Sequence, residues 1–406
     1  MAESSADEAA FRDDALAFLR ANAAERRVED TAWGVGTDRV GLFDDPAAER
    51  DLLEEARAWR RTVFDAGWAW ITGPPEFGGR GLSPRFARLY AQLEEGFDTP
   101  DQMRLSVGTG MVGPTIAAHG SDVARQRYLA AIYRADIVAC QLFSEPGAGS
   151  DLAAIRTRAT RVADGWRITG QKVWTSGGHL SDIGMVLART GDEAGRHRGL
   201  TMFIIDMHAP GVDVRPLRQM TGDASFDEVY LDDVAVADEL RLGAVDEGWS
   251  VMMTTLLNER GSIGGGGRGV GGGDHLYRRL VSVAEQVGRR GDPVVRQRLA
   301  DLRTRLSIAA WFQARMAAQD AGGRDPGPIV ALSKIMLTDN LQRTSALATE
   351  LLGASLLADS GAWGTYAWSE LVLGVPGLRV GGGTDEVQKN MLGERVLGLP
   401  REPRPG

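Results

Sequence analysis

The chain has 406 residues with 43% hydrophobic content, enough to bury a large core spread over two or three domains. Its net charge of -9 and pI near 5.3 argue against a nucleic-acid partner, although an anionic small molecule needs only a local basic patch. One cysteine, Cys140, excludes internal disulfides and a thiolate metal cluster, and the scattered histidines show no helical ligand pair, so we expect no metal.

The sequence shows no targeting or membrane segment. No apolar run approaches the roughly 20 residues that span a bilayer, and the acidic N-terminus is unlike a signal peptide. We therefore expect a cytoplasmic protein with no membrane partner.

The hydrophobic pattern divides the chain into three consecutive regions. Residues 1–135 are predicted to be helical, because apolar residues recur at spacings of three and four. From 136 to 245, short β-branched and aromatic runs separated by Gly, Asp or Pro turns predict a compact β-domain. Residues 246–406 return to helical spacing and include a long helix over 329–351. The fold class predicted is α+β.

A glycine-rich run at residues 264–273 suggests a dinucleotide-binding fingerprint at first sight. That fingerprint must follow a strand inside a βαβ unit, whereas this run follows Glu259 and Arg260 in a helical context. We interpret it as a close-packed or flexible helix start, since glycine costs a helix up to about 1 kcal/mol per residue.

Two segments of the β-region combine hydroxyl groups, glycines and an aromatic ring. They are residues 141–151 (Gln-Leu-Phe-Ser-Glu-Pro-Gly-Ala-Gly-Ser-Asp) and 170–178 (Gly-Gln-Lys-Val-Trp-Thr-Ser-Gly-Gly). Glycines let backbone N–H groups approach a ligand closely, and the Trp174 face supplies stacking area. This favours a site for a flat, polar-edged ring such as a flavin over a phosphate cradle. The alternative is a tight turn without a ligand, which Glu-Pro-Gly-Ala-Gly also favours.

These two segments resemble the flavin-contacting segments of the acyl-CoA dehydrogenase family. The likeness covers nearly the whole chain in the expected order, continuing at residues 75–82, 248–249, 257–260, 382–388 and 394–401. It implies an N-terminal all-α domain (1–135), a central β-domain (136–245) and a C-terminal four-helix bundle (246–406), with FAD between the last two. It also implies a homodimer or homotetramer, because the family's adenosine contacts cross subunits.

The family oxidises an acyl thioester to its 2,3-enoyl form: a carboxylate removes the α-proton while the β-hydrogen leaves as hydride to flavin N5. In many members that base precedes a Gly-Thr pair near the C-terminus, where this chain has Gly382. Other members place it in a Leu-x-x-Glu-Arg segment, which matches residues 256–260. The resemblance therefore implies Glu259 as the base. The alternative is that Glu259 pairs with a cation at a helix N-terminus.

The remaining site residues are carried over from matching motif positions. Cofactor contacts are implied for Gln141, Phe143, Ser144, Gly149, Ser150, Trp174, Thr175, Ser176, Glu350, Gly353, Thr384 and Glu386. Substrate contacts are implied for Ser150, Arg260 and Gly382. For Trp174, the alternative is an ordinary core tryptophan.

Two departures from the family pattern leave more than one function open. An Arg-x-Phe-Gly segment that contacts FAD across a subunit interface in many relatives is replaced by residues 288–293, with Arg289 and Arg290, and Gln141 stands where many members have an aromatic. One hypothesis is a dehydrogenase of CoA or acyl-carrier thioesters that passes electrons to an electron-transfer flavoprotein or similar acceptor. The others are a partner subunit of a heteromeric dehydrogenase with a degenerate site, and a flavin monooxygenase or oxidase of the same fold.

Overall fold

The computed structural model describes residues 5–27, 31–41, 48–191, 197–264, 273–321 and 327–401, without the side chains of 5–6, 259–264 and 320–321. The chain forms two compact units. The first comprises Met1–Arg27, Asp45–Gln219 and Asp223–Ser262, and the second comprises Val28–Asp44, Met220–Gly222 and Ile263–Gly406. Helical, β and helical regions follow one another along the chain, as predicted for the α+β fold.

The first unit begins with helices that bury an aromatic core. They are α1 (Ser5–Asn22), α2 (Glu49–Asp65), α3 (Pro84–Glu94), α4 (Gly113–His119) and α5 (Asp122–Arg134), with short turns η1 (Pro75–Phe77), η2 (Met103–Leu105) and η3 (Gly108–Val112). Strands β1 (Ala24–Glu25) and β2 (Phe97–Asp98) pair antiparallel. Trp68 lies at the centre of the aromatic core, where it stacks on Tyr90 and meets Phe11 edge-on. Such rings supply much of the buried area of a small helical layer.

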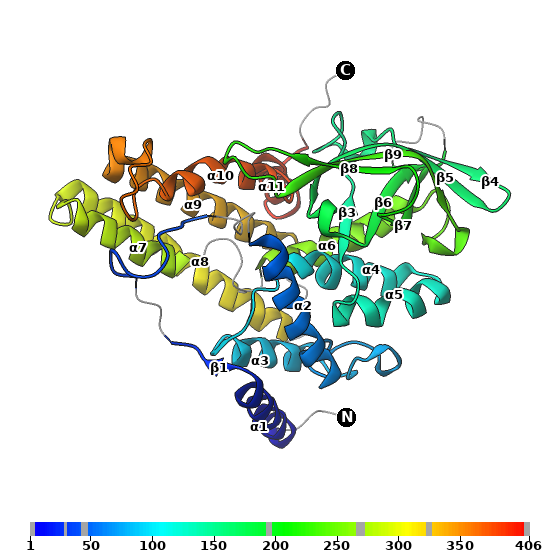
Figure 1. Ribbon diagram of the computed structural model, residues 1–406, viewed down its shortest axis with the longest axis horizontal. Helices are drawn as coiled ribbons and strands as arrows, with labels where there is room; N and C mark the ends of the chain where they lie inside the picture. Colours follow the sequence, from blue (N-terminus) through cyan, green and yellow to red (C-terminus); the bar gives the residue numbers. More distant parts are fainter. Residues whose placement is uncertain are drawn as a thin grey trace. The chain divides into compact units, whose positions relative to one another are not determined.

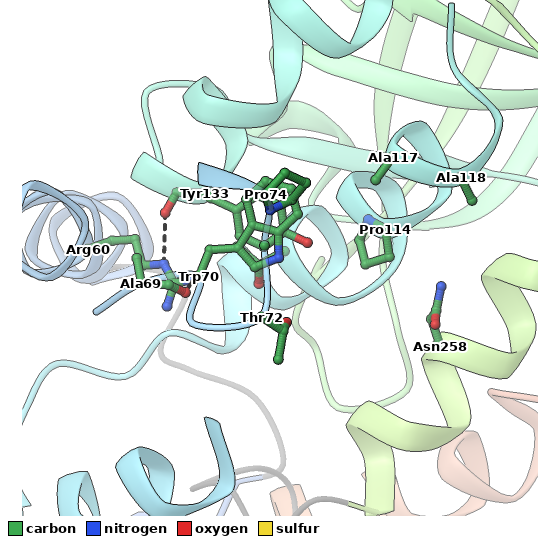
Figure 2. Close-up of a pocket in the computed structure, with 12 residues that line it drawn as sticks. Arg60, Ala69, Trp70, Thr72, Pro74, Pro114, Ala117, Ala118, Tyr133 and Asn258 are labelled. Atoms are coloured by element: carbon green, nitrogen blue, oxygen red, sulfur yellow. Dashed lines mark hydrogen bonds between the residues drawn. The ribbon is translucent and has the colours of Figure 1, made fainter. Parts of the chain in front are cut away.

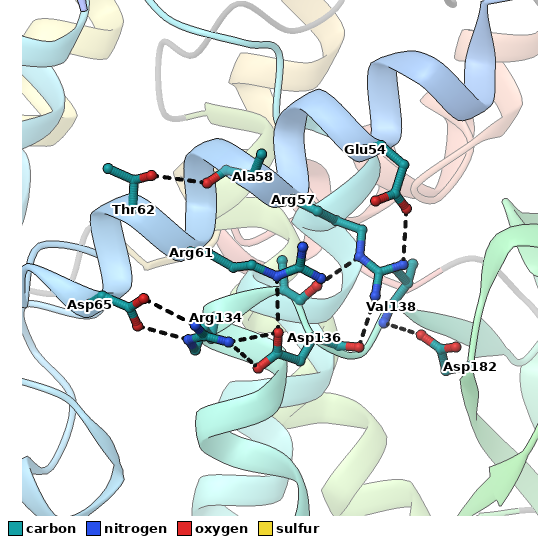
Figure 3. A network of polar contacts seen from close by, with 11 residues as sticks. Glu54, Arg57, Ala58, Arg61, Thr62, Asp65, Arg134, Asp136, Val138 and Asp182 are labelled. Carbon is teal, nitrogen blue, oxygen red and sulfur yellow. Dashed lines mark hydrogen bonds and ion pairs between the residues drawn. The ribbon is translucent and has the colours of Figure 1, made fainter. Parts of the chain in front are cut away.

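A polar network joins α2 to the end of α5 and to the segment that follows α5 (Figure 3). Arg134 bonds to Asp65 at 2.7 Å and to Asp136 at 2.8 Å. Two residues further on, the N–H of Val138 donates to Asp182 at 2.7 Å. The ion pairs are partly exposed, so each one contributes little stability on its own. Together they fix where the chain leaves the helices and enters the sheet.

An eight-stranded sheet follows. Its strands are β3 (Ala139–Leu142), β4 (Arg158–Val162), β5 (Gly165–Ser176), β6 (Ile183–Arg189), β7 (Leu200–Asp206), β8 (Val212–Leu217), β9 (Phe226–Val236) and β10 (Arg241–Leu242). The order is β10-β7-β6-β4-β5-β9-β8, and β3 pairs in parallel with β6. Most other neighbours are antiparallel, and β6 is buried along its whole length.

The sheet is covered on both faces, which explains the continuous burial of β6. Met185 and Leu187 pack with residues of α4, α5 and α6 (Gly248–Gly264), whereas Val186 and Ala188 belong to a separate core on the opposite face. This alternation follows from the two-residue period of a strand. The ends of β3 and β5, which carry the two motifs, are therefore part of a sheet with a buried core on each face.

The second unit is a set of packed helices (Figure 1). They are α7 (Gly273–Gln286), α8 (Pro293–Ala321), α9 (Ala331–Leu352), α10 (Trp368–Val380) and α11 (Asp385–Arg395), with η8 (Gly327–Val330) before α9 and η9 (Gly353–Leu356) after it. Helix α9 contacts the other four and contributes buried Leu341, Leu347 and Leu351 to the core. The predicted helix over 329–351 agrees closely with α9, which ends where Gly353 takes φ of +53°.

The glycine-rich run lies mostly outside the described residues. Helix α6 ends at Gly264 and α7 begins at Gly273, while residues 265–272 between them are not described. The expected helix start therefore remains an expectation for this run.

Candidate active site

The first motif forms a tight loop at the end of β3. Glu145 and Ala148 exchange backbone hydrogen bonds of 3.0 Å, closing the turn that the Gly and Pro content predicts. Phe143 is buried beneath the loop, whereas Gly149 and Ser150 are exposed. The Ser144 carbonyl accepts the N–H of Val173 at 2.9 Å, which joins this loop directly to β5 and the second motif.

A buried ion pair that the sequence did not single out anchors the same loop. The Lys172 ammonium is fully buried and donates to Glu145 at 2.9 Å, to the Phe143 carbonyl at 3.1 Å and to the Leu187 carbonyl at 2.8 Å. Glu145 also accepts the backbone N–H groups of residues 156 and 157 at 2.6 and 2.9 Å. Every donor and acceptor of the pair is thus used, as a buried pair requires.

The pKa values of this pair reflect burial and pairing together. Burial lowers the pKa of the Lys172 ammonium to about 8, against the opposing effect of Glu145. Burial works to raise the pKa of Glu145, but the nearby ammonium and the Arg156 N–H hold it below its usual value. The sequence carried only a weak signal for this pair, since Glu145 and Lys172 each lie inside one of the two motifs but have one polar and one apolar neighbour.

Trp174 is presented outward by a β-bulge near the end of β5. Between Lys172 and Thr175 the pairing with β9 shifts register, because Val173 and Trp174 of β5 oppose the single residue Glu228 of β9. Trp174 takes φ of +61° and remains 58% exposed. A left-handed backbone is uncommon for an aromatic residue, and such strained positions are enriched at functional sites. The core-tryptophan alternative does not fit this exposure.

The bulge separates the three predicted flavin contacts of β5. Trp174 and Ser176 are exposed, whereas Thr175 is 1% exposed and points into the protein. Its hydroxyl has no hydrogen-bond partner among the described residues. Of the two hydroxyls, Ser176 is therefore the one placed to reach a ligand beside Trp174.

These residues fit the flat ring of a flavin. A Cβ added at Gly147 or Gly149 would meet nothing within 4 Å, so the loop backbone is open to a ligand. Exposed Ser176 lies two residues after Trp174, and half-buried Ser144 is joined through its carbonyl to Val173, the residue before Trp174. An exposed aromatic face with polar groups near it is the arrangement that a planar, polar-edged ligand needs.

The second unit holds Gly382 in a loop that a lysine anchors. Gly382 and Gly383 take φ of +64° and +81°. The Lys334 ammonium donates to the Gly383 carbonyl at 2.6 Å and to Asp385 at 3.2 Å, and Gln388 donates to the Gly382 carbonyl at 3.1 Å. The loop shape is thus fixed by side chains around it, and its left-handed backbone suits glycine.

The other predicted residues of this unit take various places. Thr384 caps α11 by accepting the N–H of Val387 at 3.1 Å, and Glu386 is exposed in the first turn of that helix. Gly353 ends α9. These residues and Gly382 belong to the second unit, whereas both sequence motifs belong to the first.

Glu350 is already engaged by arginines of its own unit. It bonds to Arg289 at 3.2 Å and pairs closely with Arg298, and Arg289 also bonds to Asp292 at 2.8 Å. Hydrogen bonding to Asp292 raises the pKa of the Arg289 guanidinium further. The two segments expected near FAD at a subunit interface therefore neutralise each other in this chain.

Glu259 and Arg260 lie in α6, but their side chains lie outside the described residues. Asn258, one residue before them, lines a pocket of about 710 Å³ in the first unit. Figure 2 shows Trp70, Thr72 and Tyr133 on one side of this pocket and Pro114 and Asn258 on the other. None of the predicted flavin contacts lines it, so this pocket is separate from the Trp174 surface.

The described residues show neither a metal site nor a membrane-spanning helix. Within the described part of the chain, no group of three or more His, Cys, Asp or Glu side chains is placed to hold a metal ion. Among the described helices, none is long and apolar enough to cross a membrane.

Comparison with known proteins identifies the family. Models of the acyl-CoA dehydrogenase N-terminal, middle and C-terminal domains match residues 42–136, 140–234 and 246–397. Acyl-CoA dehydrogenase IpdE1 of Mycobacterium tuberculosis is 36% identical over 368 residues, covering 88% of this chain and 91% of that protein.

Solved structures share the fold over most of the chain. The Tcur3481-Tcur3483 steroid ACAD has a TM-score of 0.75 at 25% identity, covering 98% of this chain and 99% of that one. The ChsE4-ChsE5 complex from Mycobacterium tuberculosis has a TM-score of 0.69 at 25% identity, covering 89% and 100%. The predicted resemblance and fold are confirmed: this chain belongs to the acyl-CoA dehydrogenase family of FAD-dependent oxidoreductases, which act on the CH–CH group of acyl-CoA substrates.

Proposed function

We propose that this chain catalyses the α,β-dehydrogenation of a CoA or acyl-carrier thioester to the 2,3-enoyl thioester, with Glu259 as the base that takes the α-proton. The observation that carries the proposal is exposed Trp174, held in a left-handed backbone beside the loop that Lys172 and Glu145 anchor. A large aromatic face kept in water at a strained position is explained by a planar ligand that covers it.

The proposed β-domain, residues 136–245, supplies the contacts to the flavin ring. Trp174 offers a face, and Gln141, Ser144 and Ser176 offer hydrogen-bonding groups for its edge. When bound, FAD accepts the hydride that leaves the β-carbon. Phe143 and Thr175 are buried and support this surface from within, and exposed Gly149 and Ser150 extend it toward the thioester. The proposed helical domains are residues 1–135 and 246–406.

The proposed base lies on α6 because the other family position has no carboxylate. Gly382 lacks a side chain, and its carbonyl is bound by Gln388. An α-proton beside a thioester is weakly acidic, so its removal needs both a positioned base and donors for the developing enolate oxygen. Glu259 is proposed for the first role, and Arg260 with the backbone N–H of Gly382 for substrate binding.

The decisive experiment replaces Glu259 by Gln. We expect retained FAD and a fall of at least about a hundredfold in the rate of flavin reduction by a panel of acyl-CoAs, the lower range for a general base. Glu247→Gln is the matched control, because Glu247 is an exposed carboxylate just before α6. Unchanged reduction in Glu259→Gln would remove Glu259 from the mechanism and direct attention to Glu394, Asp385 or Glu386.

A further variant tests whether the loop of Gly382 still accepts a base. We expect Gly382→Glu not to restore the lowered rate of flavin reduction in Glu259→Gln, because a side chain in the left-handed region costs about 1–2 kcal/mol and Gln388 holds the loop. Recovered flavin reduction in the double variant would contradict this geometric argument.

The second candidate function is a partner subunit of a heteromeric dehydrogenase. It is favoured by the pairing of Glu350 with Arg289 and Arg298, which occupies groups expected to contact FAD across subunits. Two similar solved structures are also named as pairs of chains. Flavin per protomer of the purified chain decides: full occupancy supports a self-sufficient homodimer or homotetramer, and half or no occupancy supports a heteromer.

The electron acceptor distinguishes the dehydrogenase from an oxidase or monooxygenase of the same fold. For the proposed dehydrogenase we expect rapid anaerobic bleaching of the flavin by an acyl-CoA, slow reoxidation in air and fast reoxidation by an electron-transfer flavoprotein. Fast reoxidation by oxygen alone would favour the oxidase.

A further inference from the structure

A histidine just beyond the flavin strand bridges two carboxylates. His179 lies in η5 (Gly178–Leu180), which follows β5 directly. Its Nδ1 is 2.8 Å from Asp227 Oδ2, its Nε2 is 3.0 Å from Glu49 Oε2, and its backbone N–H donates to the same Asp227 oxygen at 3.0 Å. Ionised carboxylates only accept hydrogen bonds, so a ring bonded to both carries a proton on each nitrogen.

The charges around this imidazolium come from three elements. Asp227 lies on β9, opposite Thr175, and is fully buried. Glu49 is the first residue of α2 and also pairs closely with Arg104 of η2. Cys140 of β3 also interacts electrostatically with Asp227, and burial raises the pKa of its thiol to about 12, so it stays neutral. His179 therefore joins β9 and α2 to the turn after β5.

The turn that His179 holds is built closely against the sheet. Gly177 takes φ of +59°, and a Cβ added at Gly178 would lie 3.1 Å from both Asp227 Oδ2 and the Thr175 side chain. The Ser181 hydroxyl closes the turn by donating to the Gly177 carbonyl at 2.8 Å. Because Ser176 immediately precedes this turn, any movement of the turn moves the end of the strand that carries it.

We propose that His179 is a positioning residue, whose double bridge from Asp227 to Glu49 holds the end of β5 so that Ser176 and Trp174 meet the flavin. This inference rests on the proposed flavin surface. It assigns a function to α2 as well, because the helix supplies one of the two acceptors. His179 touches neither cofactor nor substrate in this role and acts through the strand.

The bridge has a pH dependence with a definite sign. Hydrogen bonding to Asp227, opposed by burial and reinforced by Glu49, raises the pKa of His179 to about 9 from the ordinary value of 6.5. A raised folded-state pKa contributes stability that is fully present below the ordinary pKa and is lost as pH rises through about 9. The bridge is therefore intact at neutral pH and opens in alkali.

The test compares His179→Gln with His208→Gln, an exposed histidine of the same sheet region. We expect His179→Gln to weaken FAD binding on the order of tenfold, the equivalent of one hydrogen bond to a charged group, and to change the visible circular dichroism of bound flavin. Flavin titration of the apoprotein gives both readouts without substrate. His208→Gln is expected to match the wild type.

Glu49→Gln keeps the experiment informative where His179→Gln folds poorly. Because one acceptor charge is lost, we expect the alkaline loss of FAD affinity to shift to lower pH in Glu49→Gln, whereas a purely structural role would leave this pH profile in place. Wild-type affinity, dichroism and pH profile in both variants overturn the proposal. If no acyl-CoA reduces a normally bound flavin, the proposed function is overturned. The role of His179 is then still tested by FAD affinity, dichroism and pH profile.

Discussion

Two loops of this molecule are held by the same chemical device in different surroundings. In the first unit, Lys172 donates to two backbone carbonyls and to Glu145, and so fixes the loop at residues 143–149, the proposed flavin loop. In the second unit, Lys334 donates to two backbone carbonyls and to Asp385, and so fixes residues 381–384. An ammonium has three donors. Lys172 bonds to two residues of its loop and to the Leu187 carbonyl of β6, whereas Lys334 bonds to Gly383 of its loop and to one residue on either side of it, Arg379 and Asp385.

The difference lies in how the acid is shared. Among the described residues, Glu145 has one cationic partner, Lys172, and otherwise binds backbone N–H groups. Asp385 also bonds to Arg379 at 2.9 Å and to the Thr338 hydroxyl at 3.0 Å. Glu145 would therefore lose its cationic partner with Lys172, whereas Asp385 would keep Arg379 and Thr338 if Lys334 were lost.

The choice of lysine is itself informative in a chain whose cations are mostly arginine. Lysine occurs only at positions 172, 334 and 389, so two of the three lysines are these loop anchors. The planar guanidinium fork suits carboxylates in two-point contact, whereas a compact ammonium suits three acceptors arranged around one point. Lys389 is exposed on α11 and provides a natural control for both anchors.

The largest effect is expected from breaking the first anchor. Lys172→Met leaves Glu145 buried with its charge unpaired, which costs roughly 3–5 kcal/mol in the free energy of unfolding. Denaturant unfolding and the amount of bound FAD measure the loss, and we expect the flavin to be lost as well because the loop is released. A Lys172→Met protein with wild-type stability and full flavin would show that the pair is dispensable.

Two companion variants identify the cause of that loss. Adding Glu145→Gln to Lys172→Met removes the unpaired charge while keeping an acceptor for the Arg156 and Thr157 N–H groups, so part of the stability is expected to return. Lys172→Arg keeps the charge but not the three-point geometry, and we expect it to remain well below the wild type. Lys389→Met should match the wild type throughout.

A smaller effect is expected from breaking the second anchor. In Lys334→Met, Asp385 keeps Arg379 and Thr338, so we expect a cost of about 1–3 kcal/mol, the range for unsatisfied buried polar groups. The same unfolding experiment measures it, and FAD content tells whether residues 381–384 also support the flavin. A loss as large as that of Lys172→Met would remove the distinction drawn between the two anchors.

The sequence predicted the order of the structural regions, because hydrophobic periodicity is a local pattern. The exposure of Trp174 is compatible with the predicted flavin contact, which stays a prediction. The sequence did not separate Thr175 from its neighbours, since the bulge after Lys172 adds one residue and changes which side chains face out. It also missed the engagement of Glu350 by Arg289, because that contact joins residues 61 positions apart. Burial of a charge and its partner depends on tertiary packing, which a motif does not record.

The smallest expected effect is in the acid range, where the carboxylates paired with the two lysines, Glu145 and Asp385, lose their charge. Burial works to raise the pKa of Glu145 and of Asp385, but their cationic and hydrogen-bonding partners hold both values below the ordinary ones. A depressed folded-state pKa contributes stability that is present above the ordinary pKa of about 4 and is lost as pH falls through the folded value. We therefore expect wild-type stability to fall on going from pH 5 to about pH 3, and Glu145→Gln to fall less, because its amide does not titrate. Asp385→Asn should show the same sign. Unfolding free energies of the three proteins across this range measure the effect, and equal pH slopes would mean that neither carboxylate carries the acid sensitivity.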